Sequence, residues 1–323
     1  MKQRMVDAPA GRVNLVEAGD GPLVLLVHGF PETWYSWRHQ LHALAAGGYR
    51  AVAIDVRGYG RSSKPADPRR YRLLDHASDN VAVVRALGER TAAIVGHDWG
   101  SPIAVTSALL RPDVFTAIGL LSVPYTPRGP VPPTAAFAGM EGDEEFYVSY
   151  FQQPGRAEAE IEPDVRGWLV GFYATLSAHG AAESTKPWFT VPHGGRLRDR
   201  FTSDQSLEWL TGEDLAHYAA EFERSGFTGA LNRYRCMDQD WIDLAAFDGA
   251  VIAQPSVFII GEQDASRVWL ANAIEQHATT LPGLVSQHVL PGVGHWIQQE
   301  AASQTSEILL SWLDQVNASG RSS

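Results

Sequence analysis

The stretch that decides the fold is TAAIVGHDWGSPIAVTSALL, residues 91–110. Its first part is a continuous apolar run, typical of a strand that is buried on both faces. Its last part has the composition of a buried helix. Between them, Gly96-His97-Asp98-Trp99-Gly100 places one glycine two residues before Asp98 and another two residues after it. We therefore expect a sharp strand-to-helix turn with Asp98 at its apex.

This turn has two interpretations. Asp98 would be an ordinary helix N-cap in a simple βα turn, a role that aspartate often fills. Alternatively, the two glycines relieve crowding in a strained turn, and the spacing is then that of a nucleophile elbow. We favour the elbow, with Asp98 as nucleophile. Because a carboxylate that attacks a saturated carbon gives a stable ester, the substrate should carry an electrophilic sp³ carbon.

The rest of the chain predicts the sheet around this turn. Short apolar runs alternate with longer helical patterns, which is typical of a parallel sheet covered by helices. The other runs are LVLLVHG at 23–29, YRAVAIDV at 49–56, FTAIGLLSV at 115–123, PSVFIIG at 255–261 and LVSQHVL at 284–290. We predict an α/β fold, with a mostly parallel central sheet and helices on both of its faces.

A different composition interrupts this pattern. Five prolines lie between residues 124 and 133, where they exclude a regular helix or a central strand. Helix formers and large aromatic residues follow, among them Trp168 and Trp188, whose packing we expect to shape selectivity. We predict a helical cap inserted at 126–244, a core formed by 1–125 and 245–323, and a flexible tail at 317–323.

Composition restricts the partners. The chain has 26 Lys and Arg against 37 Asp and Glu, a formal net charge of −11, which disfavours nucleic acid and anionic membranes. The one cysteine allows no intrachain disulfide and fits a reducing compartment. The first residues show no apolar signal segment, and nowhere is there an apolar run of membrane-spanning length. We expect a cytoplasmic protein that does not bind a membrane.

Two further residues would complete a catalytic triad. Asp264 follows the late apolar run at 255–261, and His295 follows the last one in Gly292-Val293-Gly294-His295. Nucleophile, acid and histidine is the chain order of one established triad, and strands of a parallel sheet end at the same edge. We predict His295 as the base and Asp264 as the residue that orients it. Glu262, two residues earlier, is the alternative acid.

An oxyanion hole is predicted beside the turn. His28-Gly29-Phe30-Pro31 follows a buried strand, where one backbone donor of such a hole is commonly found, so Phe30 and Trp99 would donate their N–H groups. At this point VHGFPETWYSWRHQL, DVRGYGRSS, VGHDWG and PGVGHW together resemble the bacterial soluble epoxide hydrolases of the α/β-hydrolase fold. Each piece alone is also similar to haloalkane dehalogenases.

The resemblance implies further site residues. Epoxide hydrolases of this type use two lid tyrosines on the epoxide oxygen, and FYVSYFQQPGRAEAE and FTGALNRYRCMDQDW resemble the segments that carry them. These tyrosines would be Tyr147 and Tyr234, with Tyr150 as the competitor of Tyr147. The sequence departs from the family pattern at Arg233 and Cys236. Further substrate contacts are expected from Trp99, Phe30, Pro31, Tyr150 and Trp296.

The resemblance implies hydrolysis of a small-molecule epoxide to a vicinal diol through an ester on Asp98. The sequence has no metal or dinucleotide motif, so we expect no cofactor and no metal. A haloalkane dehalogenase and a catalytically silent ligand receptor are the alternatives, and the sequence leaves a homodimer open.

Overall fold

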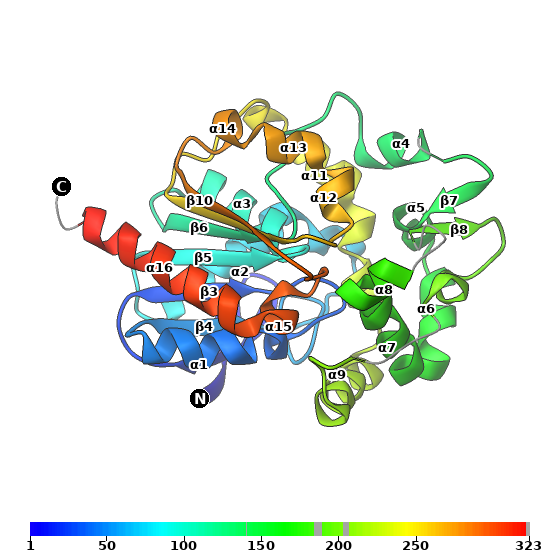
Figure 1. The fold of residues 1–323 in the computed structure, drawn as a ribbon, viewed down its shortest axis with the longest axis horizontal. Coiled ribbons are helices and arrows are strands. Elements are labelled where there is room, and N and C mark those ends of the chain that lie inside the picture. Colours follow the sequence, from blue (N-terminus) through cyan, green and yellow to red (C-terminus); the bar gives the residue numbers. More distant parts are fainter. Residues whose placement is uncertain (140, 184–188, 203–206, 321–323) are drawn as a thin grey trace.

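The computed structural model describes residues 1–139, 141–183, 189–202 and 207–320. Its centre is an eight-stranded sheet of order β1-β2-β4-β3-β5-β6-β9-β10 (Figure 1). All neighbours from β4 to β10 pair in parallel, whereas β1 pairs with β2, and β2 with β4, antiparallel. This confirms the predicted mostly parallel sheet. The strands are β1 (Lys2–Ala8), β2 (Gly11–Ala18), β3 (Leu23–Val27), β4 (Arg50–Ile54), β5 (Ala92–His97), β6 (Phe115–Leu121), β9 (Ser256–Gly261) and β10 (Leu284–Leu290).

Helices cover both faces of the sheet, which explains why its central strands are continuously apolar. Leu23, Leu25 and Val27 of β3 belong to one buried cluster, which also contains residues of α2 (Leu73–Ala86) and α3 (Gly100–Leu110). The intervening Val24 and Leu26 pack on the opposite face with α1 (Arg38–Ala46) and α16 (Ala302–Gly320). The remaining core helices are short: α12 (Ser266–Trp269), α13 (Ala271–Glu275), α14 (His277–Thr280), α15 (Ile297–Glu300), η1 (Trp34–Trp37) and η2 (Pro68–Tyr71).

The segment between β6 and β9 forms the predicted helical insertion. Figure 1 shows it as a separate layer beyond one end of the sheet. Its boundaries at 126 and 244 stay a prediction, since β6 ends at Leu121 and β9 begins at Ser256. Its helices are α4 (Pro133–Ala138), α5 (Tyr147–Gln152), α6 (Arg156–Ile161), α7 (Val165–Leu176), α8 (Ala178–Glu183), α9 (Gly212–Ser225), α10 (Thr228–Leu231) and α11 (Met237–Asp243), with 3-10 turns η3 (Glu162–Asp164), η4 (Leu197–Arg200), η5 (Tyr234–Cys236) and η6 (Ala245–Phe247).

The insertion, called the lid from here on, is not purely helical. β7 (Glu144–Phe146) and β8 (Thr190–Pro192) pair antiparallel in a small second sheet. Three residues are too few for an alternating pattern to stand out in a sequence, so this sheet was not predicted. Trp188, expected to shape selectivity, lies outside the described residues.

The last helix is longer than expected. α16 runs to Gly320, so the tail predicted from 317 begins within its last turn. The Asn317 amide donates a 2.9 Å hydrogen bond to the Tyr49 hydroxyl, which holds that turn against the core. Residues 321–323 lie outside the described part of the chain. Within the described part, no helix is both long enough and apolar enough to span a lipid bilayer.

Candidate active site

The turn after β5 is strained, as its sequence predicts. Asp98 has a φ of +50°, in the left-handed region that residues other than glycine rarely adopt. A Cβ at Gly96 would lie 2.0 Å from the carbonyl oxygen of Gly100, and a Cβ at Gly100 would lie 2.0 Å from that of Val27. Both positions therefore need glycine. The turn holds Asp98 directly after β5 and two residues before the start of α3.

The two carboxylate oxygens of Asp98 have different partners. Oδ1 accepts a 2.7 Å hydrogen bond from the backbone N–H of Phe30, and Oδ2 lies 3.5 Å from Nε2 of His295. Burial alone would raise the pKa of Asp98. The hydrogen bond from His295 and the positive charge of its ring outweigh the effect of burial, so the pKa of Asp98 lies below its usual value. Asp98 is thus an ionised carboxylate at neutral pH.

His295 is fixed by a second carboxylate. Its Nδ1 lies 3.0 Å from Oδ2 of Asp264, whose Oδ1 accepts the backbone N–H of Ser266 at 2.9 Å. Glu262, the alternative acid, instead accepts the backbone N–H of Gly292. Burial would lower the pKa of His295, but Asp264 and Asp98 together raise it well above its usual value. The structure therefore brings Asp98, His295 and Asp264 together and keeps the imidazole protonated at rest.

The backbone of His295 is held from both sides. Its carbonyl oxygen accepts hydrogen bonds from Nε2 of His97 and from the hydroxyl of Ser122, each at 2.8 Å. Its N–H donates to the carbonyl of Leu176, at the end of lid helix α7, over 2.9 Å. A Cβ at Gly294 would lie 2.3 Å from the backbone nitrogen of Ala178, so the loop and the lid are in close contact.

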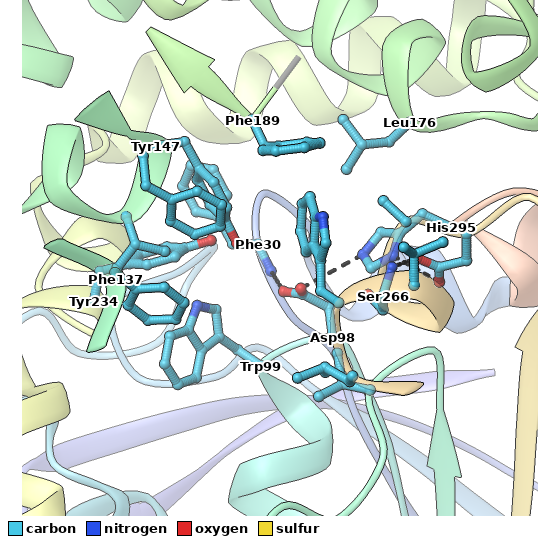
Figure 2. Close-up of a pocket in the computed structure, with 18 of the residues that line it drawn as sticks. Phe30, Asp98, Trp99, Phe137, Tyr147, Leu176, Phe189, Tyr234, Ser266 and His295 are labelled. Atoms are coloured by element: carbon cyan, nitrogen blue, oxygen red, sulfur yellow. Dashed lines mark hydrogen bonds and ion pairs between the residues drawn. The ribbon is translucent and has the colours of Figure 1, made fainter. Parts of the chain in front are cut away.

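A cavity of about 640 Å³ lies between the sheet edge and the lid, and Asp98 is one of the residues that line it. Figure 2 shows Tyr147, Tyr234 and Trp99 on one side of the Asp98 carboxylate and His295 on the other, with Phe189 and Leu176 across the cavity. Most of the wall is apolar, including lid residues that sequence reasoning missed. These are Phe137, Phe146, Val148, Phe172, Leu176, Phe189 and Met237, together with Val268, Trp269 and Leu270 of the core.

Tyr147 and Tyr234 meet in this wall although 87 residues separate them in sequence. Their ring centroids lie 6.2 Å apart, and Tyr234 also packs edge-on against Trp99 at 5.1 Å and against Phe30 at 5.4 Å. The side chain of Gln152, in α5, donates to the backbone carbonyl of Tyr234. Burial raises the pKa of both phenols, and the Asp98 charge adds to this effect, so both keep their O–H proton at neutral pH.

Three predicted substrate contacts lie elsewhere. Tyr150 does not line the cavity, and its hydroxyl donates to the carboxylate of Glu160 over 2.5 Å. The carbonyl of Pro31 accepts the hydroxyl of Tyr173, and the indole N–H of Trp296 donates to the carbonyl of the same tyrosine. Pro31, Tyr150 and Trp296 are thus packing residues, and their assignment to the substrate wall is wrong. Trp99 and Phe30 do line the cavity.

The described residues contain no group of three or more His, Cys, Asp or Glu side chains arranged to hold a metal ion. Cys236 is buried, and its thiol donates to the carbonyl of Pro68 at 3.0 Å. Burial raises the pKa of this thiol, which makes it a poor nucleophile.

Comparison with known proteins agrees with this geometry. Residues 22–302 match the family model described as alpha/beta hydrolase fold. Epoxide hydrolase B of Mycobacterium tuberculosis is 40% identical over 91% of each chain. A solved epoxide hydrolase from an endophytic Streptomyces is 62% identical and superposes with a TM-score of 0.94, covering 98% of this chain and 96% of that one. Epoxide Hydrolase A from Mycobacterium thermoresistibile is 39% identical with a TM-score of 0.90, over 97% and 98%. The chain therefore belongs to the epoxide hydrolases of the α/β-hydrolase fold.

Proposed function

We propose that this protein hydrolyses an apolar small-molecule epoxide to a vicinal diol in two steps, with Asp98 as the nucleophile. The observation that carries the proposal is the position of the Asp98 carboxylate. It faces two protonated phenols on one side and a carboxylate-bound histidine on the other, within a largely apolar cavity. These are the groups that ring opening and ester hydrolysis require.

In the first step, Oδ2 of Asp98 attacks an epoxide carbon and the ring C–O bond breaks. Oδ1 stays with the Phe30 N–H and becomes the carbonyl oxygen of the ester. The released alkoxide takes a proton from Tyr147 or Tyr234. Esterification removes the Asp98 charge that had raised the pKa of both phenols, so they become stronger acids as the alkoxide forms.

The same loss of charge prepares the second step. Asp98 is one of the two carboxylates that raise the pKa of His295, so the ester form favours a neutral imidazole. The proton that the imidazolium loses restores the phenol that was deprotonated in the first step. His295 then removes a proton from water, and the hydroxide adds to Cγ of Asp98. Negative charge develops on Oδ1, where the N–H groups of Phe30 and Trp99 stabilise it. Asp264 keeps the imidazole oriented. Collapse of the intermediate breaks the bond between Cγ and the diol oxygen. That oxygen takes the proton of the new Asp98 carboxyl group, so the diol leaves and Asp98 is again a carboxylate beside a protonated His295.

A single turnover in ¹⁸O-labelled water tests this route. With enzyme in excess over styrene oxide, we expect the first diol to contain no solvent oxygen, and the label to appear in the peptide that carries Asp98. Direct attack of water on the epoxide would instead label the diol in that first turnover. Halide release from 1-bromobutane, without diol formation from styrene oxide, would identify a haloalkane dehalogenase.

A cytoplasmic location forms part of the proposal and is supported by the single cysteine, which suits a reducing compartment. Light scattering coupled to size-exclusion chromatography would measure whether the chain forms a homodimer.

A further inference from the structure

Arg233 is a buried cation directly behind the wall of the cavity. Only 1% of its side chain is exposed, and its guanidinium forms an ion pair with Asp240. It also donates to the backbone carbonyl of Tyr71, which lies in the core turn η2. Burial lowers the pKa of Arg233 to about 10, so the side chain remains charged at neutral pH. A buried charge is costly unless it is well paired, so this arginine needs a structural or functional reason.

The face of the guanidinium that is not used in these bonds meets Trp99. The Arg233 Cζ lies over the indole ring, 5.0 Å from its centroid. Trp99 lines the cavity, and its ring packs edge-on against Tyr234, with 5.1 Å between centroids and an interplanar angle of 88°. The indole thus contacts both a buried cation and the phenol that we assign to the epoxide oxygen. A cation–π contact that is shielded from water fixes the orientation of an aromatic ring.

The indole also affects the chemistry of Tyr234. Burial dominates the raised pKa of this phenol, and the neighbouring Trp99 side chain counteracts it. Because the two rings are in edge-on contact, with centroids 5.1 Å apart, the orientation of Trp99 restricts the position of the Tyr234 ring.

We propose that Arg233 is a positioning residue for ring opening. Its guanidinium fixes the indole of Trp99, and the indole holds the phenol of Tyr234 toward the epoxide oxygen. Arg233 is not among the residues that line the cavity, so it acts through Trp99 and not on the substrate. The inference rests on the proposed function in one respect, the assignment of Tyr234 as a proton donor.

The variant Arg233→Met tests this inference when ring opening is measured separately from hydrolysis. In a His295→Gln background, where the ester should persist, the adduct on Asp98 can be followed with styrene oxide by rapid quenching and intact-protein mass. We expect adduct formation to slow about tenfold, the loss expected for a shielded cation–π contact. In the enzyme that keeps His295, Arg233→Met should change the rate of ester decay less than twofold, because Tyr234 has no role in ester hydrolysis.

Arg235 provides the matched control. It lies in turn η5, which Arg233 immediately precedes, has a side chain that is 6% exposed, and pairs with Glu158 at 2.9 Å. Arg235→Met thus breaks a comparable ion pair without a contact to Trp99, and should leave adduct formation within twofold. If both variants slow it equally, Arg233 has only a structural role. Arg233→Met combined with Asp240→Asn avoids an unpaired buried carboxylate if the single variant does not fold, and should show the same tenfold loss.

A double-mutant cycle with Tyr234→Phe separates the inference from the proposed function. If Arg233 acts through Tyr234, Arg233→Met should cause little further loss once the hydroxyl is absent. Full additivity would overturn the inference. If Tyr234→Phe alone leaves adduct formation unchanged, the donor role in the proposed function fails. If Tyr234→Phe slows it and Arg233→Met does not, only the inference about Arg233 fails.

Discussion

The two halves of the cavity are positioned by different forces. On the core side, Asp98, His295 and Asp264 are held by strained backbone and by directional hydrogen bonds, such as the 2.7 Å bond from Phe30 and the 3.0 Å contact between His295 and Asp264. On the lid side, Tyr147 and Tyr234 are held mainly by ring packing, with centroid distances of 4.8 to 6.3 Å to their aromatic neighbours. Hydrogen bonds fix a geometry closely, whereas packed rings tolerate change. We therefore expect substitutions in the core half to abolish a chemical step and substitutions in the lid half to reduce it gradually.

The largest effects should come from the core half, where substitutions of Asp98 and His295 should block different steps of the reaction. Asp98→Asn should lower steady-state turnover by roughly 10⁵-fold or more, and no adduct should form, because the nucleophile is lost. His295→Gln should slow ester hydrolysis by roughly 10²- to 10⁴-fold, so that the Asp98 adduct accumulates. Intact-protein mass spectrometry distinguishes the two. An adduct in the Asn variant would place the nucleophile elsewhere.

The two tyrosines of α5 should differ in effect, because Tyr147 lines the cavity whereas the Tyr150 hydroxyl is bonded to Glu160. Tyr147→Phe should slow ring opening by roughly 10²-fold, because one donor to the alkoxide is lost. Tyr150→Phe is the matched control, since it removes a hydroxyl that is bonded to Glu160. It should leave the rate within twofold and reduce the free energy of unfolding by about 1.5 to 3 kcal/mol, as loss of a hydrogen bond to a charged group does. Rapid-quench kinetics measures the rate of ring opening, and thermal unfolding measures the change in stability. If Tyr150→Phe slowed ring opening and Tyr147→Phe did not, Tyr150 would be the donor.

The proposed change of charge during the reaction predicts a shift in pH dependence. Asp98 raises the pKa of His295, so removing that charge should lower it. Asp98→Asn imitates the neutral ester, and an NMR titration of His295 should give a lower midpoint in this variant than in the wild type. Ester hydrolysis should correspondingly speed up as the pH rises through the lower pKa. An unchanged or higher midpoint would disprove the proposed preparation of the base.

The smallest effect should come from the apolar end of the lid. Phe137 lines the cavity and stacks on Phe146, with ring centroids 4.9 Å apart. Phe137→Ala should raise KM for styrene oxide about three- to tenfold through lost apolar contact, with kcat within twofold. A loss confined to kcat would show that the lid rings orient the substrate and do not merely bind it.

The same contrast explains what sequence reasoning could and could not find. The elbow and the positions of His295 and Asp264 were predictable because glycines and strand ends, all local features, fix them. Residues 2–18 were not assigned to strands because β1 and β2 carry charged residues, stabilised by contacts such as the 3.4 Å ion pair between Arg4 and Glu17.

The lid wall was less predictable because its contacts are not local. Tyr147 and Tyr150 lie on one short helix, and only the presence of Glu160 as an acceptor for Tyr150 separates them. Pro31 and Trp296 are sequence neighbours of Phe30 and His295, yet both contact Tyr173. Adjacency to a functional residue was a poor guide there, because neighbouring side chains point in different directions.

The hydrogen bond from the His295 N–H to the Leu176 carbonyl has a consequence for protein engineering. A chimera that takes its whole lid from a relative also takes the carbonyl group that accepts the N–H of His295, the proposed general base. Such grafts would alter the hydrolytic step along with substrate choice, even when every core residue is kept. A relative is suitable as the source of the lid if its counterpart of α7 ends at the position of Leu176.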